Sequence, residues 1–414
     1  MWGGAILLSA TIFSLLLLLQ VPGCRPGDGK IRITIWHQDR IDVRVILQRQ
    51  IDRFMKIHPE VKVEQLFKET EELRSGFIIA ALAGQGPEIV YGPSDQVGPF
   101  EIMNIILPME TMFDSTWLAC YDPRALTWYR GHLYQVADKL GNHLTLVYNR
   151  KLVPVAPATD RELIEIGRKL TVDLNGDGKT DRYGLAWNYT EPFFFIPFMT
   201  GFGGWIMDDR GNPALDSRGT IDGLKFIKEL RDVAKIIPNE ADYNVADILF
   251  KDGNAAMIIN GDWSWAGYQK AGLDIGVAPL PRIVSTGLWC EPMVSPKGFS
   301  INRNVGGDKK AWVLELIRYL MSAENQLEAT RELFTMPTHN DVRHSDFVRD
   351  NEILRNSQIQ IDHGRPMPVV PELRAIWDAM RPSYQAVLAG TMTAEQAARE
   401  MQALALRRIK EMNE

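Results

Sequence analysis

Residues 31–91 alternate between strand-like and helix-like patterns, and this alternation constrains the fold more than any other feature of the chain. Ile31-Arg-Ile-Thr-Ile-Trp36 alternates apolar and polar side chains, as a half-buried strand does. The elements predicted from such patterns are, in order, strand 31–36, helix 42–57, strand 61–63, helix 77–83 and strand 87–91. A β-α-β-α-β order is typical of a mostly parallel α/β sheet flanked by helices.

The chain is long enough for two such units. Its 414 residues exceed what one modest hydrophobic core usually organises, so we expect two lobes. A second α/β pattern runs from about 141 to 297, with a predicted strand at 144–148 and predicted helices at 160–170 and 220–236. The remainder is mainly helical, with predicted helices at 309–321, 323–334, 371–389 and 394–412. The net charge of −6 and the lack of a long basic run exclude nucleic acid as an expected partner.

The segment 256–265 indicates a binding function. An apolar run that ends at Ile259 predicts a buried strand, and Asn260-Gly261 predicts a turn because both residue types tolerate positive φ. Trp263 and Trp265 follow directly. Indole faces stack on the C–H face of sugar rings, although packing inside a core is the alternative for each indole. Alternate residues after a turn point apart, so Trp263 is the stronger candidate.

The first residues predict export. An apolar stretch ends at Val21-Pro22-Gly23-Cys24 and predicts a signal peptide over 1–23. The end of this stretch resembles a bacterial lipobox, which implies lipidation of Cys24, a tether over 24–29 and a membrane-anchored protein in the periplasm or on the cell surface. Pro22 and the absence of Lys or Arg before Arg25 depart from that pattern, and a secreted chain without lipid is the alternative. Export would permit a disulfide between Cys120 and Cys290, and two free thiols are the other reading.

Several segments then resemble one family in their order and spacing: 31–36, 86–90, 146–149, 191–193, 256–265 and 371–377. The order is similar to that of the extracellular solute-binding proteins of sugar ABC transporters, family 1, the group that includes maltose-binding protein. The resemblance implies a two-lobed type II periplasmic-binding-protein fold with a hinge, with lobe 1 at 30–140 plus 298–338 and lobe 2 at 141–297 plus 339–414. It further implies a monomer without enzymatic activity or required cofactor, whose partners are a sugar, permease subunits and an ATPase.

The resemblance also implies a set of sugar-binding residues. Trp263, Trp377 and Phe193 match ring positions of the family, and Asp39, Arg40, Asp95, Glu191 and Arg381 match or lie near its polar positions. Strand ends and the tryptophan-rich segment add two more candidates, since parallel α/β sheets bind ligands beyond the carboxyl ends of their strands. The full predicted set is Trp36, Asp39, Arg40, Asp95, Asn142, Glu191, Phe193, Trp263, Trp265, Trp377 and Arg381.

Three positions depart from the maltose-binding pattern. Phe193 stands where those relatives have tyrosine, Asn142 where they have glutamate, and Gly92 where they have a stacking tryptophan. The departures favour a different sugar, or an oligosaccharide of different length, over the usual maltodextrins.

A polar loop predicts a structural calcium site. Asp173, Asn175, Asp177 and Asp181 place oxygen atoms at alternate positions around Gly178, as the start of an EF-hand loop does. Position 12 of this loop is Gly184, so the bidentate glutamate of an EF-hand is absent. A metal-free polar turn is the alternative.

An exported glycosidase and a surface lectin are the alternatives to a sugar receptor. An exported glycosidase would need two carboxylates on either side of one bond, and Glu191 and Asp95 are the candidates. The chain lacks the repeated β-α pattern of a barrel hydrolase and a G-x-S-x-G elbow. A surface lectin would carry its aromatic side chains on an open face instead of between lobes.

Overall fold

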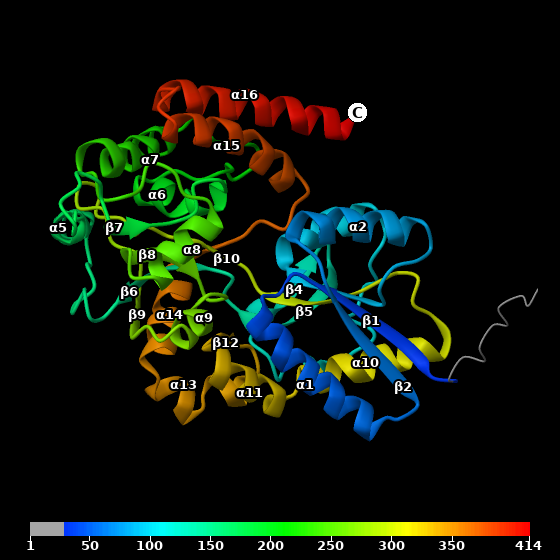
Figure 1. Ribbon diagram of the computed structural model, residues 1–414. Helices are drawn as coiled ribbons and strands as arrows, with labels where there is room; N and C mark the ends of the chain where they lie inside the picture. Colours follow the sequence, from blue (N-terminus) through cyan, green and yellow to red (C-terminus); the bar gives the residue numbers. More distant parts are fainter. Residues whose placement is uncertain (1–28) are drawn as a thin grey trace, which may run out of the picture.

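The computed structural model describes residues 29–414, so the predicted signal peptide and the predicted lipidation site at Cys24 lie outside the described residues. Two β-sheets, each covered by helices, form the two lobes (Figure 1). The first lobe is built around a seven-stranded sheet and the second around a four-stranded sheet. This arrangement confirms the predicted two-lobed α/β fold.

The first sheet has the strand order β12-β5-β11-β3-β1-β2, with β4 paired to β5. In β1, Ile33 and Ile35 are fully buried while Arg32 is exposed, which is the alternation expected from the sequence. Its strands are β1 (Ile31–His37), β2 (Val61–Phe67), β3 (Ile89–Pro93), β4 (Leu126–Tyr129), β5 (His132–Leu140), β11 (Lys297–Ile301) and β12 (Met336–Pro337).

The second sheet has the order β7-β8-β6-β9, and a separate pair of short strands joins β10 to β13. These strands are β6 (Leu144–Asn149), β7 (Tyr183–Ala186), β8 (Ala255–Gly261), β9 (Ile275–Ala278), β10 (Met293–Val294) and β13 (Arg365–Pro366).

Both sheets are mixed, so the expectation of mostly parallel sheets is wrong in this detail. β1 is parallel to β2 and β3, and β7 is parallel to β8. β5, β11 and β6 pair antiparallel with their neighbours. The physical reason lies in the connections: β4 and β5 form a hairpin, and β11 enters the first sheet from the second lobe instead of through a β-α-β crossover.

The helices of the first half are α1 (Ile41–Ile57), α2 (Thr70–Leu82), α3 (Val97–Ile102), α4 (Ser115–Leu118), α5 (Asp160–Leu170), α6 (Ile196–Gly201), α7 (Arg218–Lys228), α8 (Tyr243–Lys251) and α9 (Trp265–Lys270). Those of the second half are α10 (Gly307–Leu320), α11 (Ala323–Leu333), α12 (Asn340–Arg343), α13 (Asp346–Asp350), α14 (Glu352–Asp362), α15 (Glu372–Leu388) and α16 (Ala394–Asn413). Short 3₁₀ turns lie at Ser94–Gln96, Pro123–Ala125 and Pro192–Phe194, and a π-helical turn at Glu229–Val233 extends α7. Among the described residues, no helix has the length and apolar character needed to cross a membrane.

The chain crosses between the lobes at segments that lie next to each other. The first crossing follows β5 and uses two residues of positive φ, Gly141 at 138° and Asn142 at 43°. The backbone N–H of Ser295, on a second crossing, donates to the Gly141 carbonyl at 2.8 Å. This pairing holds the two crossings together at the base of the cleft.

Helix α14 is shared between the two hydrophobic cores. Ile353 packs in the core of the second lobe, whereas Leu354 and Ile361 pack in the core of the first. The predicted lobe boundaries therefore stay a prediction, and residues 352–362 contribute to the hydrophobic cores of both lobes.

Candidate functional site

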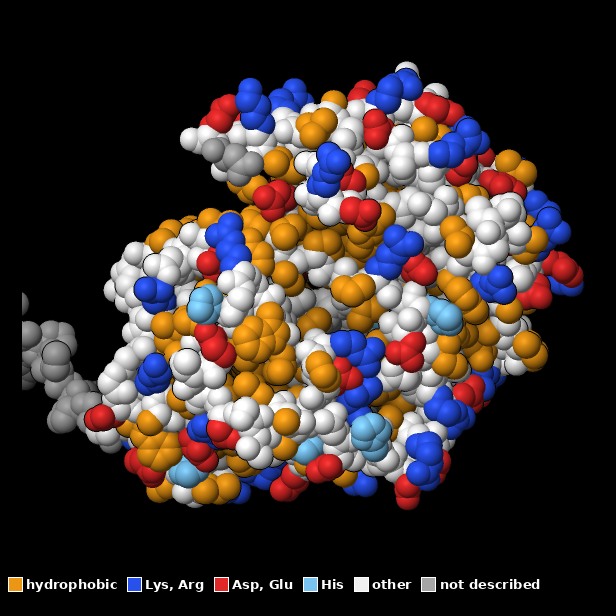
Figure 2. Space-filling view, turned by 180° about the vertical axis from the view of Figure 1, so that it is seen from behind, with side chains coloured by type: hydrophobic (Ala, Val, Ile, Leu, Met, Phe, Trp, Pro, Cys, Tyr) orange, Lys and Arg blue, Asp and Glu red, His pale blue; other side chains and the backbone are white. Residues whose placement is uncertain are grey.

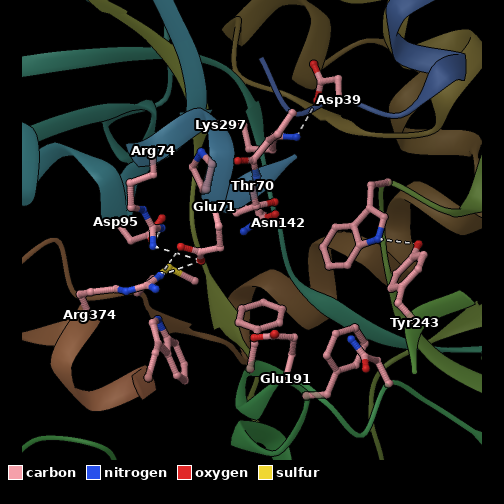
Figure 3. Close-up of a pocket in the computed structure, with 18 of the residues that line it drawn as sticks. Asp39, Thr70, Glu71, Arg74, Asp95, Asn142, Glu191, Tyr243, Lys297 and Arg374 are labelled. Atoms are coloured by element: carbon pink, nitrogen blue, oxygen red, sulfur yellow. Dashed lines mark hydrogen bonds and ion pairs between the residues drawn. The ribbon is translucent and has the colours of Figure 1, made fainter. Parts of the chain in front are cut away.

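A pocket of about 270 Å³ lies between the lobes, where the surface is hollowed and hydrophobic side chains gather (Figures 2 and 3). The first lobe and the crossings contribute mostly polar residues, and the second lobe contributes aromatic rings together with further charged groups. The lining residues are Gln38, Asp39, Arg40, Thr70, Glu71, Arg74, Pro93, Asp95, Asn142, Asn188, Glu191, Phe193, Phe194, Tyr243, Trp263, Lys297, Met367, Arg374, Trp377 and Arg381.

Three rings form an aromatic wall on the second lobe. The Phe193 ring lies 6.4 Å from Trp263 and 6.5 Å from Trp377, measured between centroids. All three rings pack against the core of the second lobe, so this wall rests on a rigid base. The Trp263 Nε1–H donates to the Tyr243 hydroxyl at 3.0 Å, which fixes the orientation of the indole.

Gly261 supports the aromatic wall by leaving room for the Trp263 ring, and not by forming the turn that the sequence predicts. Strand β8 continues through Asn260 and Gly261, and neither residue has a positive φ, so the predicted turn at this pair is wrong. The Trp263 indole instead folds back over Gly261, where an added Cβ would lie 2.1 Å from the indole Cζ3. Glycine is required here because the ring approaches the backbone closely.

Asp95 and Arg74 supply part of the polar wall opposite the rings. Arg74 donates to Asp95 Oδ2 at 2.9 Å, while Asp95 Oδ1 is buried without a hydrogen-bond partner. Burial raises the pKa of Asp95 above its ordinary value, and the positive charge of Arg74 only partly opposes this rise. Asp95 therefore carries one unsatisfied acceptor oxygen at this side of the pocket.

A buried charge cluster, consisting of Asp39, Asp138, Lys139, Asp262 and Lys297, lies at the base of the pocket. Lys297 Nζ donates to Asp39 Oδ1 at 2.6 Å. Burial alone would raise the pKa of Asp39, but Lys297 and Lys139 outweigh it and lower the pKa to about 2. Burial raises the pKa of Asp262 to about 6 despite the same two lysines, because Asp262 lies deep at the crossing between the lobes.

Two arginines of α15 hold carboxylates at the edge of the pocket. Arg381 binds Glu191 at 2.9 Å, and Arg374 binds Glu71 of α2 at 2.6 Å. Asp378 lies between them, accepts a hydrogen bond from Arg381 and forms an ion pair with Arg374. The second of these pairs joins one lobe to the other.

The structure brings together all but two of the predicted sugar-binding residues. The prediction is wrong for Trp36 and Trp265, because neither lines the pocket. Trp36 packs beneath α2, with Lys68 Nζ 4.7 Å from its ring, since alternation along β1 directs it to that face. Trp265 is 0% exposed and begins α9 inside the core, with its ring edge-on to His143 at 5.9 Å. No ligand reaches a side chain so buried.

Sequence reasoning missed several lining residues, and the most important are Glu71, Arg74, Tyr243, Lys297 and Arg374. Helix α2 begins at Thr70, seven residues before the predicted start, because its first turns face the pocket and carry polar side chains instead of an apolar stripe. Tyr243 and Arg374 sit in first turns of helices and become binding candidates only when the lobes meet.

The loop at 173–181 is folded by its own hydrogen bonds. Asp173 accepts from the backbone N–H groups of Gly176 and Gly178, and Asp181 accepts from those of Leu174 and Asn175. Within residues 29–414 no group of three or more His, Cys, Asp and Glu side chains is arranged to hold a metal ion. The calcium site gains no support from this geometry and stays a prediction. Cys120 and Cys290 are free, so the reading as two thiols is the correct one of the two.

Comparison with known proteins agrees with this architecture. Residues 41–327 match the family model described as bacterial extracellular solute-binding protein. A solved maltose/maltodextrin-binding domain from Bdellovibrio bacteriovorus, bound to maltotriose, is 45% identical and superimposes with a TM-score of 0.88, covering 92% of this chain and 100% of that one.

Two curated relatives are more distant in sequence. The maltotriose-binding protein of Pyrococcus abyssi is 26% identical over 87% of this chain and 78% of its own length. A maltooligosaccharide ABC transporter solute-binding lipoprotein of Streptococcus pneumoniae is 22% identical over 80% of this chain and 78% of its own length. Fold, cleft and family match agree, and the chain belongs to the bacterial extracellular solute-binding proteins, a family of receptors and not of enzymes.

Proposed function

We propose that this protein binds a short maltooligosaccharide, such as maltotriose, between its lobes and delivers it to an ABC importer at the outer face of the cytoplasmic membrane. The observation that carries the proposal is the aromatic wall of Phe193, Trp263 and Trp377 facing Asp95 and Asp39 across one cleft. The rings cover the apolar faces of glucose units, and carboxylates accept hydrogen bonds from their hydroxyls. A hinge motion that closes two such walls removes water and strengthens those bonds.

The departures from the maltose-binding pattern fit a change of length better than a change of sugar. Gly92 carries no ring, and the Gln96 side chain occupies the space where a side chain at 92 would begin, 2.8 Å from an added Cβ. A stacking position is thereby lost on the first lobe while the second lobe keeps its wall. The relatives named for maltotriose support glucose units as the ligand.

The glycosidase reading is weaker because both of its candidate carboxylates are held by arginines. Asp95 is paired with Arg74, and Glu191 with Arg381. Membrane attachment through Cys24 and delivery to permease and ATPase subunits belong to the same proposal, supported by the lipoprotein named among the relatives.

Calorimetric titration of the purified protein tests the proposal. Maltose, maltotriose, longer maltooligosaccharides and galactooligosaccharides are titrated in parallel, and the sugars are recovered and checked for cleavage. Binding of glucose oligomers without products is the expected result. Release of cleavage products would contradict the assignment as a receptor. Binding of galactose oligomers alone would contradict the assignment of a maltooligosaccharide as the ligand.

A further inference from the structure

Two contacts between the lobes bound the pocket on opposite sides, and we call them the rim contacts. In the first, Arg374 of α15 donates to both carboxylate oxygens of Glu71 of α2 at 2.6 Å. In the second, the Arg40 guanidinium lies 4.3 Å from the centroid of the Tyr243 ring. All four residues line the pocket, and Figure 3 shows Glu71 and Arg374 on one side of it and Tyr243 on the other.

The Glu71–Arg374 pair is braced from both lobes. Arg74 lies 3.6 Å from Glu71 on α2, and Asp378 lies 3.3 Å from Arg374 on α15. Although burial raises the pKa of Glu71, the hydrogen bond from Arg374 and the charge of Arg74 lower it below its ordinary value. The side chains of Glu71 and Arg374 are 57% and 35% exposed, so the pair stands between the pocket and solvent.

The volume between the rim contacts is small. About 270 Å³ lies just below the roughly 300–1,000 Å³ typical of small-molecule sites. A sugar chain that continued past either end would have to occupy the place of a guanidinium that joins the two lobes. Both contacts and full closure are compatible only with a ligand that ends inside the pocket.

We propose that the rim contacts limit ligand length, so that the protein selects short maltooligosaccharides and rejects long ones. This inference rests on the proposed function and adds the feature that determines specificity within it. Arg374 and Arg40 act as end stops: each lies across the path of an additional sugar unit while it holds its partner on the other lobe. The aromatic wall then binds the units between the stops and sets affinity without setting length.

The test is the ratio of affinities for a short and a long ligand, measured by calorimetry with maltotriose and maltoheptaose. The wild-type protein should bind maltotriose at least roughly tenfold more tightly. Arg374→Ala and Arg40→Ala each open one end, so each should lower this ratio by about fivefold or more. Glu71→Ala should act in the same direction as Arg374→Ala, and thermal unfolding verifies that all variants are folded.

Lys270→Ala is the matched control. Lys270 of α9 forms an ion pair of 2.6 Å with Asp42 of α1, which also joins the two lobes but does not line the pocket. Its loss should change both affinities by the same factor and leave the ratio as in the wild type. A wild-type protein without length preference, or a ratio that neither arginine variant changes, would overturn the end stops. A lack of binding to every glucose oligomer would instead overturn the proposed function.

Discussion

Replacement of Gly261 by alanine should weaken sugar binding although Gly261 itself touches no ligand. The new Cβ would lie 2.1, 2.2 and 2.4 Å from three carbons of the Trp263 indole. Since carbon atoms in contact lie about 3.5–4.0 Å apart, the ring edge must retreat by more than ~1 Å. Strand β8 is buried along its whole length and paired on both sides, so the indole moves more easily than the backbone.

The size of the effect follows from what the indole holds in place. A displaced Trp263 loses its hydrogen bond to the Tyr243 hydroxyl, which is worth about 0.5–1.5 kcal/mol. A displaced aromatic face loses a further ~0.5–1.5 kcal/mol of stacking on the ligand. The hydrogen bond is lost from the free and the bound protein alike and so lowers stability, while the loss of binding free energy is the stacking contribution of about 0.5–1.5 kcal/mol, or roughly 2- to 13-fold in the dissociation constant.

Calorimetry with maltotriose measures this change, and a double-mutant cycle identifies its route. Gly261→Ala added to Trp263→Ala should cost nothing more than Trp263→Ala alone, because the clash disappears with the ring. Gly306→Ala is the control, since nothing lies within 4 Å of an added Cβ at that position. Wild-type affinity in Gly261→Ala would refute the argument, as would full additivity of the two substitutions.

The remaining predictions concern stability and chemistry outside the aromatic wall. Trp265→Ala should lower the free energy of unfolding by about 3–5 kcal/mol in urea titrations while the folded protein keeps its sugar affinity; weakened binding at full stability would contradict its place in the core. Because burial raises the pKa of Asp262 to about 6, its contribution to stability is complete below about pH 4 and is lost as the pH rises through 6. Asp262→Asn should therefore lose less stability than the wild type between those pH values, by up to ~3 kcal/mol, and equal pH profiles would count against this. A thiol reagent should modify half-buried Cys120 in the folded protein but not Cys290, whose pKa burial raises; peptide mapping that finds equal labelling would show otherwise. If calcium occupies the loop at 173–181, a chelator lowers the melting temperature, and an unchanged melting temperature removes the site.

The sequence pattern predicts the bounds of a helix correctly where the residues of that helix carry its start signal and its apolar stripe. Helix α5 has the bounds predicted from the sequence, 160–170, and the structure shows that a capping box of Thr159 with Glu162 begins it. Helix α2 was predicted too short because its first turns face the cleft and lack an apolar stripe. The helix predicted for 220–236 leaves α-helical geometry after Lys228, and no residue type there announces a π turn.

Among the binding residues, too, some positions follow from the sequence and others depend on tertiary structure. Trp263 and Trp265 are two residues apart and carry the same side chain, yet one lines the pocket and the other is buried. Their difference depends on the space over Gly261 and on the start of α9, and both are tertiary features. Order and spacing of motifs nevertheless located nine of the twenty lining residues.

The sequence by itself determined the two α/β lobes, the family and the aromatic side of the cleft, because periodicity and motif order are properties of neighbouring residues along one chain. Only the tertiary structure decided that the sheets are mixed, that Trp36 and Trp265 belong to the packing, and that Glu71 meets Arg374 across the cleft. Glu71 and Arg374 lie on different lobes, 303 residues apart in the chain. Contacts at that separation form only after both lobes have folded and closed, so no local signal in the sequence records them.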